Sequence, residues 1–490
     1  MVIASPSASF CCTTRSGSTH RRFAQSISRR VGSNRASRVM ARLNASSDGE
    51  VVHELNYNNH RRGRGAVPVY VTLPSDALGP TAQTMRRKRA MAQSFRALSA
   101  AGVEGLVMEV WWGLVEREFP RRYNWKGYLE IVEMAKRFGL KVRAVMAFHQ
   151  CGLSPDDPFW IPLPVWVLEE MDKDRNVSYG DRFRRTNIEY ISLGCDILPI
   201  LHGRSPIQAY ADLMRNFRDT FRSFLGGVIT VKLARGIQVG LGPGGELRYP
   251  SFPTQKLIWD QRSYELGEFQ CYDKYMLASL DARTRELSSM QNPNSTDFFL
   301  RWYSKMLLLH GERICREAES IFRDNKVNMS GKVAGAHWHY DSTIRDGFMP
   351  VVRMFGRYGF TVCCTCFEMR DDDMNRPGRP ESLLKQLMLA ARICDVPLEG
   401  ENYSTDLEDE SFGQILKMSR LCSDGLETPS FSFNFVRMDK NLFEPRNWVS
   451  FTRFVRRVSE MNVFRAGLDF EGGNGSSSPV AAFTGAVLAY

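Results

Sequence analysis

Residues 103–149 read VEGLVMEVWWGLVEREFPRRYNWKGYLEIVEMAKRFGLKVRAVMAFH. The first ten and the last ten residues of this stretch are rich in apolar and β-branched side chains, which predicts two buried strands. Between them, residues 128–138 carry apolar side chains at helical spacing and predict an amphipathic helix. A strand, a helix and a second strand in this order are typical of parallel strands joined by a crossover helix.

The same alternation continues along most of the chain. Strands are expected at Val67–Leu73, Val103–Trp112, Leu140–His149, Val228–Gly240, Lys332–Trp338, Phe360–Glu368, Val396–Glu401 and Phe431–Met438. Helices are expected at Thr81–Ala101, Tyr128–Phe138, Pro206–Leu225, Phe298–Phe322, Ile344–Tyr358, Ser382–Ile393, Phe412–Leu421 and Trp448–Met461. Eight such repeats are the number that closes a (β/α)8 barrel.

A doubly wound open sheet is the alternative α/β architecture. It usually has a glycine-rich phosphate loop after its first strand. Here the first strand ends in Thr72-Leu73-Pro74-Ser75-Asp76, which is no such loop. The sequence therefore predicts an α/β fold, a (β/α)8 TIM barrel with long loops on its C-terminal face, over residues 66–465.

Charge is distributed unevenly along the 490 residues. The formal net charge is +11, from 65 Lys and Arg against 54 Asp and Glu. Eight arginines fall within residues 1–47, which contain no lysine and no acidic residue, so the rest of the chain carries only +3. A near-neutral body disfavours a nucleic-acid groove. No run reaches the ~18 apolar residues that span a bilayer, so we also expect no membrane insertion.

Residues 1–47 are rich in arginine and serine and free of acids, a composition typical of organelle transit peptides. We interpret them as a plastid transit peptide, which predicts a location in the chloroplast or plastid stroma. The alternative is a disordered basic tail that binds an anionic partner. Residues 48–65 are polar and are expected to be a linker, and residues 466–490 are expected to be a flexible tail.

The C-terminal ends of the predicted strands carry several polar side chains. They are Glu109, His149, Glu246, His337, Glu368, Glu401 and Arg437. Active sites of such barrels lie at this face. Two carboxyl groups on opposite sides of one pocket suit glycoside hydrolysis, because one donates a proton to the leaving oxygen and the other activates water or attacks the sugar. Any single glutamate here could instead be a buried, paired structural group.

Several longer strings carry a more specific signal. They are GLGPGGELRYPSF at 240–252, GEFQCYDKY at 267–275, FHQCG at 148–152, VWWG at 110–113, SGKVAGAHWHY at 330–340 and GEN at 400–402. Together they closely resemble plant β-amylases, glycoside hydrolase family 14. The string at 330–340 is most similar to the chloroplast members. The resemblance covers residues 66–465.

The resemblance implies a barrel enzyme that releases β-maltose, with inversion, from non-reducing ends of α-1,4-glucans such as starch and maltooligosaccharides. It implies no cofactor and no metal, and we expect a monomer. By matched position, Glu246 is expected to be the general acid and Glu401 the general base. The residues expected to contact the sugar are Glu109, His149, Asp157, Lys332, His337, Thr365, Asn402, Tyr403 and Arg437. Of these, Asp157 falls on the family's mobile lid.

The chain departs from the family pattern at several places. The lid segment 149–157 reads HQCGLSPDD where the family usually has HQCGGNVGD, and proline stiffens a loop. Glu109 stands where the family carries aspartate. Family segments are missing after Asp341 and between Leu287 and Phe298, and extra residues fall near 230–235. These departures leave an alternative: a catalytically weakened or inactive glucan-binding or regulatory protein on the same barrel.

Eleven cysteines are present, of which Cys11 and Cys12 lie in residues 1–47. The remaining nine are an odd number scattered through apolar segments, which predicts reduced, buried thiols and not a disulfide framework. The Cys363-x-x-Cys366 motif lacks the second pair that a zinc site needs and lies within a predicted strand. We therefore interpret it as part of the barrel wall.

Overall fold

A computed structural model describes the chain at residues 67–152, 159–229, 236–248, 270–287, 296–325, 327–333, 347–371, 380–404, 407–422 and 431–459. The predicted transit peptide (1–47), linker (48–65) and tail (466–490) lie outside these residues. So do two of the predicted sugar-contacting residues, Asp157 and His337, and the extra residues at 230–235.

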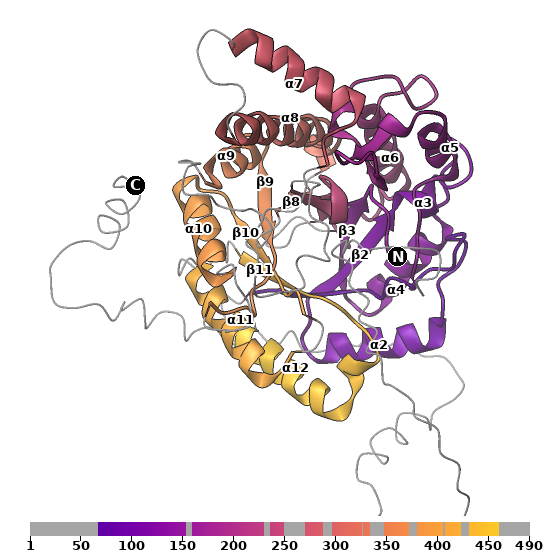
Figure 1. Cartoon of the computed structure of the whole chain (residues 1–490). Helices are drawn as coiled ribbons and strands as arrows, with labels where there is room; N and C mark the ends of the chain where they lie inside the picture. Colours follow the sequence, from indigo (N-terminus) through magenta and orange to yellow (C-terminus); the bar gives the residue numbers. More distant parts are fainter. Residues whose placement is uncertain are drawn as a thin grey trace, which may run out of the picture. The chain divides into compact units, whose positions relative to one another are not determined.

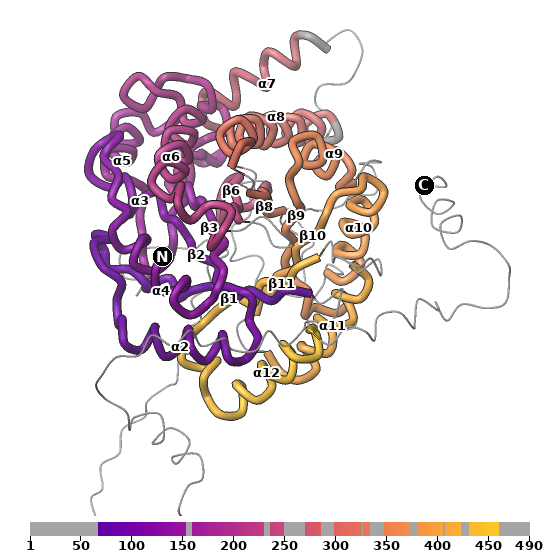
Figure 2. Tube along the Cα trace, turned by 180° about the vertical axis from the view of Figure 1, so that it is seen from behind, coloured from indigo at the N-terminus to yellow at the C-terminus, as the bar shows by residue number. Residues whose placement is uncertain are grey.

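Within the described residues, eight parallel strands form a closed barrel (Figure 1). They are β1 (Val69–Thr72), β2 (Gly105–Trp111), β3 (Lys141–Ala147), β6 (Ile237–Val239), β8 (Met329–Val333), β9 (Phe360–Cys364), β10 (Leu398–Glu401) and β11 (Phe431–Phe435). Each strand of this series pairs with the next one, and the last strand, β11, pairs with the first, β1. Figure 2 shows β1 and β11 side by side. The predicted (β/α)8 barrel is confirmed.

The fourth strand is interrupted. After β6, the chain makes a tight turn and then forms β7 (Glu246–Leu247), which pairs with the end of β8. The fifth strand, predicted to begin at Lys332, begins at Met329, because the backbone from Met329 onward already pairs with β6 and β9. The split of the fourth strand places the Glu246 side chain beside the end of β8.

Helices surround the barrel (Figure 1). They are α2 (Lys88–Ala100), α4 (Lys126–Arg137), α6 (Pro206–Thr220), α8 (Thr296–Phe322), α9 (Met349–Arg357), α10 (Pro380–Ile393), α11 (Asp409–Cys422) and α12 (Pro445–Ser459). All eight correspond to predicted helices. The first was predicted to begin at Thr81 but begins at Lys88, because the preceding residues form a turn closed by a bridge between Leu78 and Met85. No helix in the described residues has the length and apolar composition to cross a membrane.

Some elements were not predicted. They are the helices α3 (Trp112–Val115), α5 (Val165–Lys173) and α7 (Lys274–Leu287), and an antiparallel hairpin of β4 (Ser178–Gly180) and β5 (Thr186–Ile191). Helix α5 and the hairpin lie between β3 and α6, in a stretch that has no long periodic pattern. Tertiary contacts and not local periodicity select such short elements.

The two faces of the barrel wall differ in polarity. Side chains alternate along each strand, so neighbours in the sequence point to opposite faces. On β10 and β11, Leu398 and Phe433 belong to the apolar core shared with the helices. The polar side chains that alternate with such residues are buried within the barrel: Arg143, Gln238, Ser330, Lys332, Thr361, Glu399, Glu401, Ser432 and Asn434. Barrel interiors are usually filled by branched apolar residues, so a polar interior is unusual.

The apolar core includes residues of α2, and this helix offers a test of the core face. Phe95 is fully buried and contacts Phe138 edge-to-face. We expect Phe95→Ala to lower the free energy of unfolding by about 3–5 kcal/mol, through lost burial and a cavity. Urea denaturation followed by tryptophan fluorescence measures the change. Gln93, exposed on the same helix, is the control. Equal effects of Gln93→Ala and Phe95→Ala would contradict the assignment of the core face.

Candidate active site

Three buried charged residues meet where β7 begins and β8 and β10 end. The Lys332 ammonium donates a hydrogen bond to Glu401 Oε1 at 2.6 Å and lies 4.0 Å from Glu246 Oε1. Glu246 is 2% exposed, and Glu401 and Lys332 are each 8% exposed. One ammonium thus lies close to two carboxyl groups from different strands.

Local backbone geometry explains how Glu246 reaches this place. The turn before it contains Gly244 and Gly245, whose φ angles of 62° and 74° lie in the left-handed region that favours glycine. The Gly244 N–H donates to Glu189 Oε1 at 3.0 Å, which fastens the turn to the β4–β5 hairpin. A side chain at Gly245 would bring its Cβ to 3.2 Å from His149 Cε1. The turn is therefore built for a close approach to His149.

The surroundings of Glu246 favour its protonated form. Burial raises the pKa of its carboxyl, and the charges of Glu401 and Glu189 raise it further. The cations of Lys332 and Arg248 act in the opposite direction, with Arg248 Nη1 3.9 Å from Glu246 Oε2. The net shift is upward, so this carboxyl binds its proton more tightly than an ordinary glutamic acid.

Glu401 is held on both sides of β10. Its Oε2 accepts from the Cys363 thiol, with the sulfur 3.7 Å away on β9. The next residue, Asn402, donates to the Val436 carbonyl and accepts from the Val436 N–H at 2.8 Å. Glu368 Oε1 accepts from the backbone N–H groups of Tyr403 and Ser404 at 2.8 and 2.6 Å. These bonds fix the chain that follows Glu401 to the ends of β9 and β11.

His149 supplies a neutral ring to the same face. It is buried, and its ring meets the Trp111 indole edge-to-face at 5.3 Å. Burial, together with the charges of Arg248 and Lys332, lowers the pKa of His149 to about 3. The imidazole is therefore uncharged at neutral pH and can exchange hydrogen bonds with a hydroxyl group.

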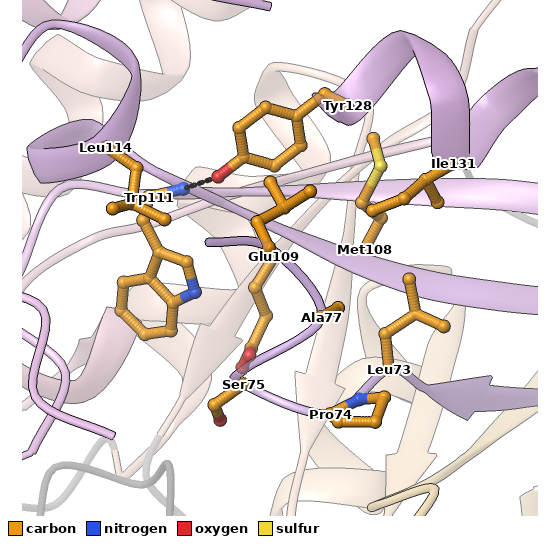
Figure 3. A pocket seen from close by; sticks show the side chains of 11 residues that line it. Leu73, Pro74, Ser75, Ala77, Met108, Glu109, Trp111, Leu114, Tyr128 and Ile131 are labelled. Carbon is orange, nitrogen blue, oxygen red and sulfur yellow. Dashed lines mark hydrogen bonds between the residues drawn. The ribbon is translucent and has the colours of Figure 1, made fainter. Parts of the chain in front are cut away.

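Glu109 and Arg437 were predicted as separate sugar contacts, and the structure places them in one ion pair. Arg437 donates two hydrogen bonds to the Glu109 carboxylate, at 3.1 and 3.2 Å. It also donates to the Leu73 carbonyl and, at 2.6 Å, to Ser75 Oγ. Figure 3 shows Glu109 extending toward Ser75, beside a small pocket walled by apolar side chains including Met108 and Ile131. The pair joins the ends of β2 and β11 to the loop after β1.

Residues 70–297 and 288–463 match the family model described as "Glycosyl hydrolase family 14". The chain belongs to glycosyl hydrolase family 14. It is 43% identical over 449 residues to "Beta-amylase 1, chloroplastic" of Arabidopsis thaliana, a match that covers 82% of this chain and 77% of that protein. It is 41% identical over 471 residues to "Beta-amylase 1, chloroplastic" of Oryza sativa subsp. japonica, covering 87% of this chain and 85% of that protein.

A solved structure supports the same architecture. The catalytic domain of beta-amylase from Paenibacillus polymyxa superposes on this family 14 chain with a TM-score of 0.63 at 21% identity. The match covers 80% of this chain and 99% of that domain. At this identity the likeness shows the barrel fold. Membership of family 14, which the residue strings of the sequence predicted, is confirmed.

The family 14 barrel gathers residues that sequence reasoning singled out and others that it missed. Thr365, Asn402 and Tyr403 follow β9 and β10 directly, at the rim that holds Glu246 and Glu401. Glu189 and Arg248 were missed. Arg248 lies only two residues after Glu246, so its position was a usable signal. Glu189 lies on the hairpin that the sequence pattern did not reveal, and no local signal points to it.

The cysteine prediction is confirmed for the described part of this family 14 chain. None of the nine described cysteines from Cys151 to Cys422 forms a disulfide, and most are buried, including Cys363, Cys364 and Cys366. Burial raises the pKa of the Cys363 and Cys364 thiols well above the ordinary value. Such thiols are poor nucleophiles and poor metal ligands.

The raised pKa of Glu246 predicts an unusual pH dependence of stability. The unfolded carboxyl ionises near pH 4.5, below the folded one, so the folded state loses stability as pH rises through that window. Glu246→Gln abolishes this loss. We expect the variant to melt at a higher temperature than the unmodified protein at pH 7, and the difference to shrink as pH falls to about 4.5.

Thermal unfolding at both pH values, followed by circular dichroism, measures this difference. Glu410→Gln is the control, because the Glu410 side chain is 84% exposed. A Glu246→Gln variant that melts below the unmodified protein at pH 7 would refute the raised pKa.

Proposed function

We propose that this chain hydrolyses α-1,4-glucosidic bonds of starch and maltooligosaccharides from their non-reducing ends and releases β-maltose by inversion. Membership of family 14 supports the reaction class, and relatives over most of the chain carry the name beta-amylase. The observation that carries the proposal is the placement of the Lys332 ammonium close to both Glu246 and Glu401 at the barrel rim. Two carboxyl groups in such different environments suit an acid and a base.

Glu246 acts as the general acid. A general acid must still hold its proton at the working pH, and the buried position of Glu246 raises its pKa. It donates this proton to the glucosidic oxygen as the bond breaks. Arg248 and Lys332 then stabilise the carboxylate that forms.

Glu401 acts as the general base. Burial alone would lower the pKa of Lys332. The negative charges of Glu401 and Glu246 have the larger effect and raise this pKa, so Lys332 carries its positive charge at neutral pH. A permanent cation 2.6 Å from Glu401 stabilises that carboxylate. Inversion requires a water between the base and the sugar, for which carboxyl separations of about 6.5–9.5 Å leave room. Asn402 keeps this carboxylate in place through its bonds to Val436.

The remaining predicted residues bind the sugar. Neutral His149, Thr365 and Tyr403 offer hydrogen bonds to hydroxyl groups. The paired Glu109 and Arg437 are the charged members of this set. Asp157 and His337 complete the predicted set. The enzyme works as a monomer and needs neither metal nor cofactor.

The site of action is the plastid stroma. The Arabidopsis and rice relatives named above are described as chloroplastic. Residues 1–47 of this chain have the arginine- and serine-rich, acid-free composition of a transit peptide.

Two variants test the catalytic roles. Glu246→Gln and Glu401→Gln each remove one proton-transferring group while they keep the size of the side chain. We expect each to lower kcat on soluble starch by at least about 100-fold, because general acid–base catalysis contributes about 100- to 10,000-fold. Reducing-end release and the anomeric signal of fresh maltose in proton NMR measure the rate and the stereochemistry.

The exposed variant Glu410→Gln should keep full activity. Release of α-maltose would contradict inversion. Binding of soluble starch with no maltose at high protein concentration would instead support a glucan-binding protein on the same barrel.

The location is tested by import. We expect the full chain fused to a fluorescent protein to enter plastids, and the same fusion without residues 1–47 to stay in the cytosol. Confocal microscopy of leaf cells measures the distribution. Plastid import of the shortened fusion would place the signal elsewhere in the chain.

A further inference from the structure

A second charge pair is buried inside the barrel, below the rim. Arg143 of β3 and Glu399 of β10 are both 0% exposed, and Arg143 Nη2 lies 3.3 Å from Glu399 Oε1. Two fully buried opposite charges stabilise a fold only when each is well compensated. The two residues are absent from the set of sugar-contacting and proton-transferring groups proposed above.

The Arg143 guanidinium connects four strands. It donates to Asn434 Oδ1 and, at 3.2 Å, to Ser432 Oγ, both on β11. Its central carbon lies 4.5 Å from the centroid of the Tyr70 ring on β1, a cation–π contact. With Glu399 on β10, one side chain of β3 thus holds three other strands around the barrel axis.

The Glu399 carboxylate has fewer polar contacts than the Arg143 guanidinium. Within the described residues, neither of its carboxylate oxygens has a hydrogen-bond partner, although both are buried. The carboxylate is therefore stabilised chiefly by the charge of Arg143. A buried carboxylate without its counter-ion is strongly disfavoured.

This pair is next to the proposed general base. Glu399 and Glu401 are two residues apart on β10 and so point to the same, inner face, about 7 Å apart along the strand. In the register of β10 and β11, Glu401 lies opposite Asn434 and Glu399 lies opposite Ser432. Arg143 therefore hydrogen-bonds to the two residues of β11 that lie opposite these two glutamates.

The charged and titratable groups around Glu401 come from several strands. Lys332 of β8 and Glu246 of β7 lie at the rim, and the Cys363 thiol of β9 lies 3.7 Å away. From below come the negative charge of Glu399 and the positive charge of Arg143. Without Arg143, Glu399 would be an uncompensated negative charge close to Glu401.

We propose that Arg143 is a positioning residue for the general base: it neutralises Glu399 and holds β10 against β11, so that the Glu401 side chain keeps its place and has no unpaired negative charge beside it. The inference rests on the proposed hydrolase function and adds a residue that never touches substrate. Arg143 contributes through the electrostatics of the barrel interior.

The pH profile of kcat/KM on maltooligosaccharides tests the proposal, because its acid limb reports the ionisation of the base. In Arg143→Gln, the remaining charge of Glu399 makes Glu401 harder to ionise, so the acid limb moves to higher pH. In Glu399→Gln, the remaining charge of Arg143 moves it to lower pH. We expect shifts of about 0.5–1 pH unit. The double variant should return the limb to its original position.

A second expectation separates positioning from binding. Arg143→Gln should lower kcat and leave KM for maltooligosaccharides within about threefold, because the loss is in the chemical step. Arg204→Gln is the matched control. Arg204 is another buried arginine in an ion pair, 2.9 Å from Glu116, so its loss should lower stability and leave the acid limb in place.

The proposal stands only if the two single variants move the acid limb in opposite directions and the double variant restores it. Any other pattern overturns it. If Arg143→Gln does not fold, a downward shift in Glu399→Gln that the double variant reverses supports the pair, and an unmoved limb in both overturns it. A failure of the proposed function is distinct, because the unmodified protein would then release no β-maltose.

Discussion

The pairing of β6 with β8 converts a sheet into a closed barrel. The N–H groups of Gly236 and Ile237 donate to the Asn328 carbonyl at 3.1 and 3.2 Å, and Ile237 lies in register with Met329. Closure brings the C-terminal ends of all eight parallel strands to one rim. Only then do two remote glutamates face the ammonium of Lys332. They are Glu246, which follows the turn after β6, and Glu401, which ends β10.

Closure also encloses an unusual interior. Polar side chains fill much of the barrel, and a low-dielectric surrounding makes each of their charges expensive unless it has a partner. Lys332 lies close to the two glutamates at the rim, and Arg143 forms an ion pair with Glu399 below them. The two cations belong to different strands, so the charges of the interior are balanced across the barrel and not along any one strand.

The environments of the two rim glutamates differ in ways that chemistry can use. Glu246 is the more buried of the two, and its raised pKa suits a proton donor. Glu401 has an ammonium at hydrogen-bond distance, which suits a proton acceptor. The same lysine therefore helps to give two identical side chains different roles.

The sequence alone predicted the class of fold and the residues that we propose for the site. Alternating strand and helix patterns predicted the barrel, because hydrophobic periodicity is a local property. Residue strings around Glu246, His149 and Glu401 resembled those of family 14. Such strings are contiguous in the chain, so they can be compared without the fold. Tertiary structure alone decided which residues pair. Arg143 interrupts an apolar run, and Glu189 lies in a stretch without pattern. Their partners, Glu399 and the turn at Gly244, are remote in the chain, and only the closed barrel brings them within bonding distance.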